Sequence, residues 1–174
     1  MLQSLRSDLT KEIPPQEEHH HRHVRDMTPR LRALLARVRE KHGEKHHEIE
    51  DIEKLFGEIA REMIMHIQKE EQILFPYVDA GERSVNGQGS LEPPFFQTVR
   101  NPIHMMMKEL DAAGEAVKQI RKASSECTAP EGACTSFKAL YQGLREFEDD
   151  LHEHVRLENN ILFSRAVSLE GVTA

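Results

Sequence analysis

The stretch His66-Ile67-Gln68-Lys69-Glu70-Glu71-Gln72-Ile73-Leu74-Phe75 returns in a second form as His154-Val155-Arg156-Leu157-Glu158-Asn159-Asn160-Ile161-Leu162-Phe163. Each copy has a histidine, a β-branched residue, a glutamate four positions after the histidine and a final Ile-Leu-Phe run. Residues four apart on a helix lie on one face, about one turn from each other. Two such helices facing one another would bring two imidazoles and two carboxylates to one point. That donor set suits a borderline metal such as iron.

Both copies lie on predicted helices, and the rest of the chain supplies two more. Apolar residues recur at alternating steps of three and four, as in the series Ile49, Ile52, Phe56, Ile59 and Met63. This spacing is typical of a helix with one buried face. It predicts helices over about 17–41, 45–75, 101–123 and 134–167. Because the connections are short or moderate, we expect an all-α, up-down-up-down antiparallel four-helix bundle.

Proline and glycine set the expected boundaries. Residues 1–16 are polar and end at Pro14-Pro15, which predicts an N-terminal arm followed by a bundle domain over residues 17–170. Pro29 predicts a kink or a later start in the first helix. Pro76 is expected to end the second helix, and the Gly-, Ser- and Pro-rich segment 81–94 to form a long loop.

Length and charge narrow the class of protein. The chain has 174 residues, no Trp and a formal net charge of −7, which fits one α-helical domain and argues against nucleic acid as a partner. No apolar run approaches the roughly 20 residues that span a bilayer, so no membrane is expected as a partner. Residues 1–6 lack the apolar core of a secretion signal. Two cysteines are too few for a disulfide framework, so we expect a cytoplasmic location.

The up-down arrangement predicts where the polar residues of the helix seams meet. The beginning of the first helix lies beside the ends of the second and fourth helices, so one layer should contain His21, His66, Glu70, His154 and Glu158. Two buried carboxylates close together are costly unless they are neutralised. A network of two His–Glu pairs is the alternative, but metal ions neutralise the carboxylates better. The five residues are therefore candidate metal ligands.

Several other polar residues have open roles. His20 is close enough in phase to His21 to be a rival ligand, whereas His19 and His23 fit a solvated helix face. Glu62 lies one turn before His66 and is a candidate for an outer acid or proton carrier. His42 falls at the far end of the bundle, where a solvated helix terminus is expected.

The sequence resembles the hemerythrin-like (HHE) cation-binding family, and within it the di-iron proteins called repair of iron centres, which are associated with nitrosative and oxidative stress. The likeness covers residues of about 17–167. It is carried by His21 with Arg25 and Pro29, by the stretches 66–76 and 154–163, and by Pro102-Ile103, Asp111-Ala112-Ala113-Gly114 and Pro130-Glu131-Gly132-Ala133-Cys134-Thr135.

The resemblance implies a non-haem di-iron centre, with an oxo or hydroxo bridge as one option. Terminal ligands would be His21, His66 and His154, and bridging ligands Glu70 and Glu158. It implies iron handling and repair of iron–sulfur clusters, with iron ions and apo iron–sulfur proteins as partners. The alternatives are a module that binds or senses O2 or NO, and a nitric oxide or peroxide reductase, so enzymatic activity stays open.

One position departs from the family pattern. The family has Glu-His-Asp-x-Ala-Gly in the third helix, and this chain has Glu109-Leu110-Asp111-Ala112-Ala113-Gly114. Leu110 fits the third apolar seam, so the fold should tolerate it, but one iron would lose an imidazole. The substitutes considered are Glu62, Glu109, His104 and His20.

Overall fold

The computed structural model describes residues 2–90, 92 and 94–173, and the side chains among them from Glu18 to Gly171. All regular secondary structure in these ranges is helical. In chain order the elements are α1 (Leu2–His42), α2 (Glu48–Lys69), η1 (Glu70–Leu74), α3 (Phe75–Val85), α4 (Arg100–Ala123), α5 (Thr135–Leu157), η2 (Glu158–Leu162) and α6 (Phe163–Thr173). The segments η1 and η2 are single π-helical turns, each of which joins two α-helices into one rod.

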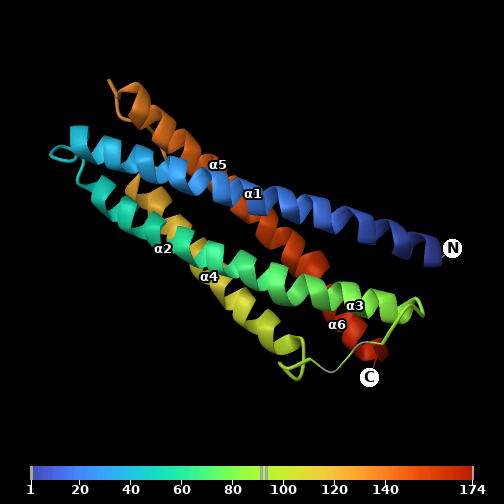
Figure 1. The fold of residues 1–174 in the computed structure, drawn as a ribbon. Coiled ribbons are helices and arrows are strands. Elements are labelled where there is room, and N and C mark those ends of the chain that lie inside the picture. The colour runs from blue at the N-terminus through green and yellow to red at the C-terminus, as the bar shows by residue number, and fades with distance from the viewer. Residues whose placement is uncertain (1, 91, 93, 174) are drawn as a thin grey trace.

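Four rods result, and they run alternately up and down (Figure 1). The long helix α1 lies beside α5 and α2, and α4 packs against α2. The outer segments α3 and α6 pack on each other at the end of the bundle where α1 begins (Figure 1). The predicted all-α, up-down-up-down bundle is confirmed. Within the described residues, no helix combines the length and apolar composition needed to cross a membrane.

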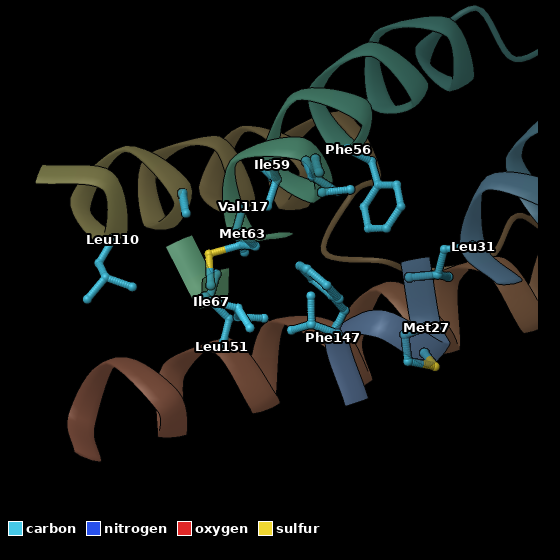
Figure 2. Packing of buried hydrophobic residues seen from close by; sticks show 14 of the residues in the cluster. Met27, Leu31, Phe56, Ile59, Met63, Ile67, Leu110, Val117, Phe147 and Leu151 are labelled. Carbon is cyan, nitrogen blue, oxygen red and sulfur yellow. The ribbon is translucent and has the colours of Figure 1, made fainter. Parts of the chain in front are cut away.

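The apolar seams fill the interior as the three-four spacing predicts. Side chains with almost no exposure come from every long helix, among them Leu31, Ile52, Phe56, Met106 and Leu140. Figure 2 shows residues of this core from α1, α2, α4 and α5 facing one another. Such burial is the main stabilising contribution to a helical bundle. Since this core is built from apolar side chains, we expect the fold to tolerate substitution of the polar residues in the helix seams.

A close approach between α1 and α5 depends on Gly143. A Cβ atom at this position would lie 2.7 Å from Cδ2 of Leu31 and 3.5 Å from Cε of Met27. The absence of a side chain therefore lets α1 lie tightly against α5. Farther along the same pair of helices, His20 and His21 of α1 lie beside His154 of α5.

The predicted end of the second helix at Pro76 is wrong. The rod continues through η1 into α3, and Pro76 lies in the first turn of α3. Proline is tolerated there because it has no N–H to leave unpaired and its ring escapes the carbonyl four residues earlier. The wider turn of η1 is closed by the Phe75 N–H, which donates to the Glu70 carbonyl. Gly81, predicted in a loop, is thus buried in α3 against Leu169.

The predicted start of the first helix near Glu17 is also wrong. The helix α1 begins at Leu2 and continues through Pro14, Pro15 and Pro29. Pro29 is exposed, so the carbonyl of Arg25, which loses its helical partner, faces the solvent side. The side chains of residues 1–17 lie outside the described residues, and the division into an arm and a bundle domain stays a prediction.

Candidate metal centre

Three rods contribute side chains to one buried layer. The middle of α1 supplies His21. The junction of α2 and η1 supplies His66 and Glu70, and the junction of α5 and η2 supplies His154 and Glu158. None of the five is more than 2% exposed. The side chains predicted from the sequence to share a layer therefore do so.

The polar atoms of this layer converge. One ligand atom from each of His66, Glu70, His154 and Glu158 lies within 4.8 Å of those of the other three. His21 joins them, because its Nε2 is 3.0 Å from Oε2 of Glu70. We name these five residues the His/Glu cluster.

Each imidazole in the His/Glu cluster turns its Nε2 atom toward a glutamate. Nε2 of His66 lies 3.1 Å from Oε1 of Glu158 and 3.7 Å from Oε2 of Glu70. Nε2 of His154 lies 2.5 Å from Oε1 of Glu158 and 3.9 Å from Oε2 of Glu70. Both carboxylates are thus shared between imidazoles of different helices, the arrangement expected of groups that bridge two cations.

The electrostatics of the two glutamates favour bound cations. Burial raises the pKa of Glu70, and the negative charge of Glu158 raises it further. Burial opposes ionisation of Glu158 as well, but hydrogen bonds from His154 and His66 outweigh it and lower its pKa to about 2. Oε1 of Glu70 is buried and has no hydrogen-bond partner in the described structure. A buried carboxylate oxygen needs a partner, and a cation bound at this point would provide one. Three imidazoles and two carboxylates together suit a borderline cation such as iron.

Two further carboxylates hold the outer nitrogens of the imidazoles. Oε1 of Glu71 is 2.9 Å from Nδ1 of His21, and Arg25 donates two hydrogen bonds, of 3.0 and 2.8 Å, to the same Glu71. Oε2 of Glu109 is 3.2 Å from Nδ1 of His66, and Lys69 pairs with Glu109. Carboxylates behind metal-binding histidines fix the ring orientation and leave Nε2 free to bind.

The role of Glu71 was not predicted from the sequence, and Glu109 was predicted only as a substitute ligand. A signal was present in each case. Glu71 directly follows Glu70, and Arg25, one turn after His21, supplies the cation that holds it. Glu109 directly precedes the position where a histidine was expected. The sequence position of Glu71 or Glu109 does not predict which imidazole its carboxylate contacts. That contact depends on how helices from distant parts of the chain pack together.

Loss of an outer carboxylate should weaken metal binding without removing a ligand. We expect Glu109→Gln to lower the metal affinity about 10–100-fold, the usual effect of losing such a partner. The measurement is competition with a chelator of known affinity. The matched control is Glu115→Gln on the exposed side of the same helix, where Glu115 contacts only Lys118 among the described ion pairs. Equal affinities in the two variants would contradict the role assigned to Glu109.

Protons should compete with metal at the His/Glu cluster. Burial alone would lower the pKa of His21 and of His66, but the hydrogen bonds and charges of Glu70, Glu71 and Glu158 outweigh it and raise both. Each raised pKa stabilises the metal-free fold below the ordinary histidine value of 6.5, a contribution lost as the pH rises through the raised value.

Metal requires the neutral imidazole. We therefore expect the metal affinity to fall steadily from about pH 8 to about pH 6, with protons released on binding. Titration calorimetry in buffers of different ionisation enthalpy measures the released protons. An affinity that stays constant over this range would contradict the competition.

The remaining predicted residues lie outside the cluster. Nδ1 of His20 is 2.7 Å from Oδ1 of Asp150. Glu62 is half-exposed beside Arg61, and His104 is exposed at the start of α4. His42, predicted at a solvated terminus, is instead half-buried, with Nε2 3.1 Å from Sγ of Cys134.

Leu110 occupies the interior at the position where the resemblance led us to expect a histidine. It is 2% exposed, and it points from α4 toward α5 (Figure 2). Its neighbour Glu109 contacts His66, so position 110 lies next to the layer of the His/Glu cluster. The fold tolerates the leucine, as expected from the apolar seam.

Known proteins resemble this chain over most of its length. The profile of the hemerythrin HHE cation binding domain matches residues 16–166. A probable iron-sulfur cluster repair protein of Haemophilus influenzae is 37% identical over 153 residues, which cover 86% of this chain and 60% of the relative. The iron-sulfur cluster repair protein YtfE of Yersinia pseudotuberculosis is 38% identical over 149 residues, covering 86% and 61%. The chain thus spans about 60% of the length of these relatives.

Proposed function

The chain belongs to the hemerythrin HHE cation-binding family, whose domain binds non-haem iron, and from this we propose that it carries iron in the His/Glu cluster and supplies it for the repair of iron–sulfur clusters. The relatives named as iron–sulfur cluster repair proteins support the proposal. Partners would be iron–sulfur proteins that have lost iron.

The ligand assignment rests on one observation. Two fully buried glutamates from different rods share three imidazoles, and Oε1 of one of them, Glu70, lacks any hydrogen-bond partner in the described structure. In the proposed centre, His21, His66 and His154 would hold the iron through Nε2, and Glu70 and Glu158 would be the carboxylates shared between the ligand sets. Iron bound there would be a redox-active cation that can be exchanged.

The protein residues account for both retention and release. Glu71 and Glu109 hold two of the imidazoles by Nδ1 and keep Nε2 directed inward. The apolar core of the bundle keeps the ligand helices in place when the cation leaves. At position 110, a leucine provides no donor atom, so fewer protein ligands retain the iron than the family pattern would supply. This composition favours delivery over permanent storage.

Iron transfer is the test of the proposed function. The full chain, loaded with iron and freed of unbound metal, is mixed with an apo iron–sulfur protein, a sulfide source and a thiol reductant. We expect cluster assembly to outpace that in a mixture of Glu158→Ala protein with the same total amount of ferrous iron. A chain that binds iron yet leaves the apo protein unrepaired would contradict the delivery role.

A second candidate function is binding or reduction of nitric oxide. It is favoured by the same leucine, because three imidazoles and two carboxylates leave coordination positions open for a small molecule. Rapid, repeated consumption of nitric oxide by the reduced iron-loaded chain would support this candidate. Failure of iron transfer together with such turnover would make the enzyme the better assignment.

A further inference from the structure

Three additional histidines surround His21 on α1 and lie outside the His/Glu cluster. His19 and His23 are four residues apart on the helix, with ring centroids 6.4 Å apart and ring planes inclined by 32°. The rings of His19 and His20 have centroids 5.7 Å apart. Histidines at this spacing present both imidazoles on one side of a helix, where they can bind the same divalent transition cation.

The outer pair combines access with an unsatisfied nitrogen. His19 is exposed, whereas Nε2 of the half-buried His23 is shielded from solvent and has no hydrogen-bond partner in the described structure. A shielded ring nitrogen without a partner is unfavourable. A cation held jointly with the exposed His19 would provide that partner.

His20 connects this pair with the interior. It is only 7% exposed, and its ring centroid lies 5.8 Å from that of the cluster residue His154. Its Nδ1 contacts Oδ1 of Asp150, while the second oxygen, Oδ2, is buried without a hydrogen-bond partner in the described structure. Asp150 lies on α5 one turn before His154. Metal-binding atoms thus follow one another from the surface to the buried layer.

We propose that His19 and His23 form a second, weaker site for a divalent transition cation, and that His20 and Asp150 guide iron between this outer site and the His/Glu cluster. A cation held by two imidazoles and water is bound more weakly than one held by the five side chains of the His/Glu cluster. Weak binding is needed at an outer site that iron occupies only in passing. The guiding role rests on the proposed iron-carrying function, whereas cation binding at the outer pair does not.

Titration of the iron-loaded full chain with Co²⁺ tests the outer site. We expect a weakly bound equivalent of Co²⁺ whose affinity falls at least about ten-fold in the double variant His19→Ala/His23→Ala. The control removes two exposed imidazoles elsewhere, as His47→Ala/His104→Ala, and should bind Co²⁺ as the parent does. Undiminished Co²⁺ binding in the His19/His23 variant, or an equal loss in the control, would overturn the site.

Iron release to a strong ferrous chelator tests the guiding role. We expect release to slow at least about three-fold in the His19→Ala/His23→Ala variant and in His20→Gln, with unchanged iron content and helicity. The glutamine retains a hydrogen-bond donor for Asp150, so slower release in that variant reflects loss of the imidazole. Release at the parental rate in both variants would overturn the guiding role.

The chelator assay contains no iron–sulfur protein, so the two proposals fail separately. If the variants release iron more slowly but the parent chain does not repair an apo iron–sulfur protein, the guiding role is supported and the proposed delivery function is contradicted. If repair proceeds normally and the variants release iron at the parental rate, the guiding role is contradicted and the proposed delivery function stands.

Discussion

Replacing Glu158 with alanine is expected to abolish binding of paired iron while the helical content stays unchanged. Glu158 is fully buried and contacts both His66 and His154. Its low pKa keeps it ionised throughout the neutral and mildly acidic range. The substitution therefore removes a permanent negative charge and the carboxylate shared by two rods. We expect a loss well above the roughly 10–100-fold caused by removing an outer partner.

Glu70→Ala should have the same effect on iron, although its effect on the metal-free protein differs. Removing Glu70 relieves the unfavourable pairing of the two buried carboxylates, since the charge of Glu158 adds to the energetic cost of ionising Glu70. The metal-free Glu70→Ala protein should thus unfold at a temperature no lower than that of Glu158→Ala. Glu158→Ala leaves two buried imidazoles without their shared acceptor.

Metal analysis and circular dichroism measure both outcomes. The control is Glu58→Ala, which removes an exposed glutamate from the same helix as His66. It should retain full iron content. A Glu158→Ala or Glu70→Ala protein that still binds two irons per chain would contradict the bridging role. Loss of helicity in either variant would instead show that the substituted glutamate is needed for folding.

Replacing Leu110 with histidine is expected to raise iron affinity about ten-fold or more, the scale on which single groups at a metal site act. Leu110 is buried, points toward α5 (Figure 2) and adjoins Glu109, which contacts His66. An imidazole here would add a fourth to a layer that now has three imidazoles and two carboxylates. It would also slow iron release, because one more bond must break.

The comparison that isolates position 110 is Ala112→His. Ala112 is exposed on the same helix two positions later, so this variant adds an imidazole to the surface and not to the interior. Iron content, chelator competition and the optical spectrum should change only for Leu110→His. Identical spectra and affinities in the parent and Leu110→His would show that position 110 does not reach the iron.

The helix seams could be predicted because the spacing of apolar residues is visible within each helix, and the same residues then fill the core of the bundle. The same holds for the convergence of His21 with the two His–Glu pairs, which follows from helix direction and position along each rod. The outer contacts could not be predicted in this way. Glu71 and Glu109 meet their imidazoles through helices 50 and 43 residues away in sequence, at angles that depend on packing.

The two wide turns could not be predicted for a different reason. Pro76 signals a helix end in a sequence, but η1 places it in a first turn, where proline is accepted. Both wide turns begin at a cluster glutamate, Glu70 or Glu158, and π turns are common at functional sites. The prolines of α1 show the same limit: they are read as boundaries, yet the helix runs through them.

The two wide turns, η1 and η2, also determine which faces of the following helices, α3 and α6, point toward each other. One additional residue advances a helix face by about 100°, so η1 and η2 rotate α3 and α6 by equal steps at matching heights. Gly81 still meets Leu169, and Arg165 still pairs with Glu82, because the two offsets agree. An insertion or deletion in one repeat would break that agreement unless the other repeat gained or lost a residue too, which ties the lengths of the two repeats to each other.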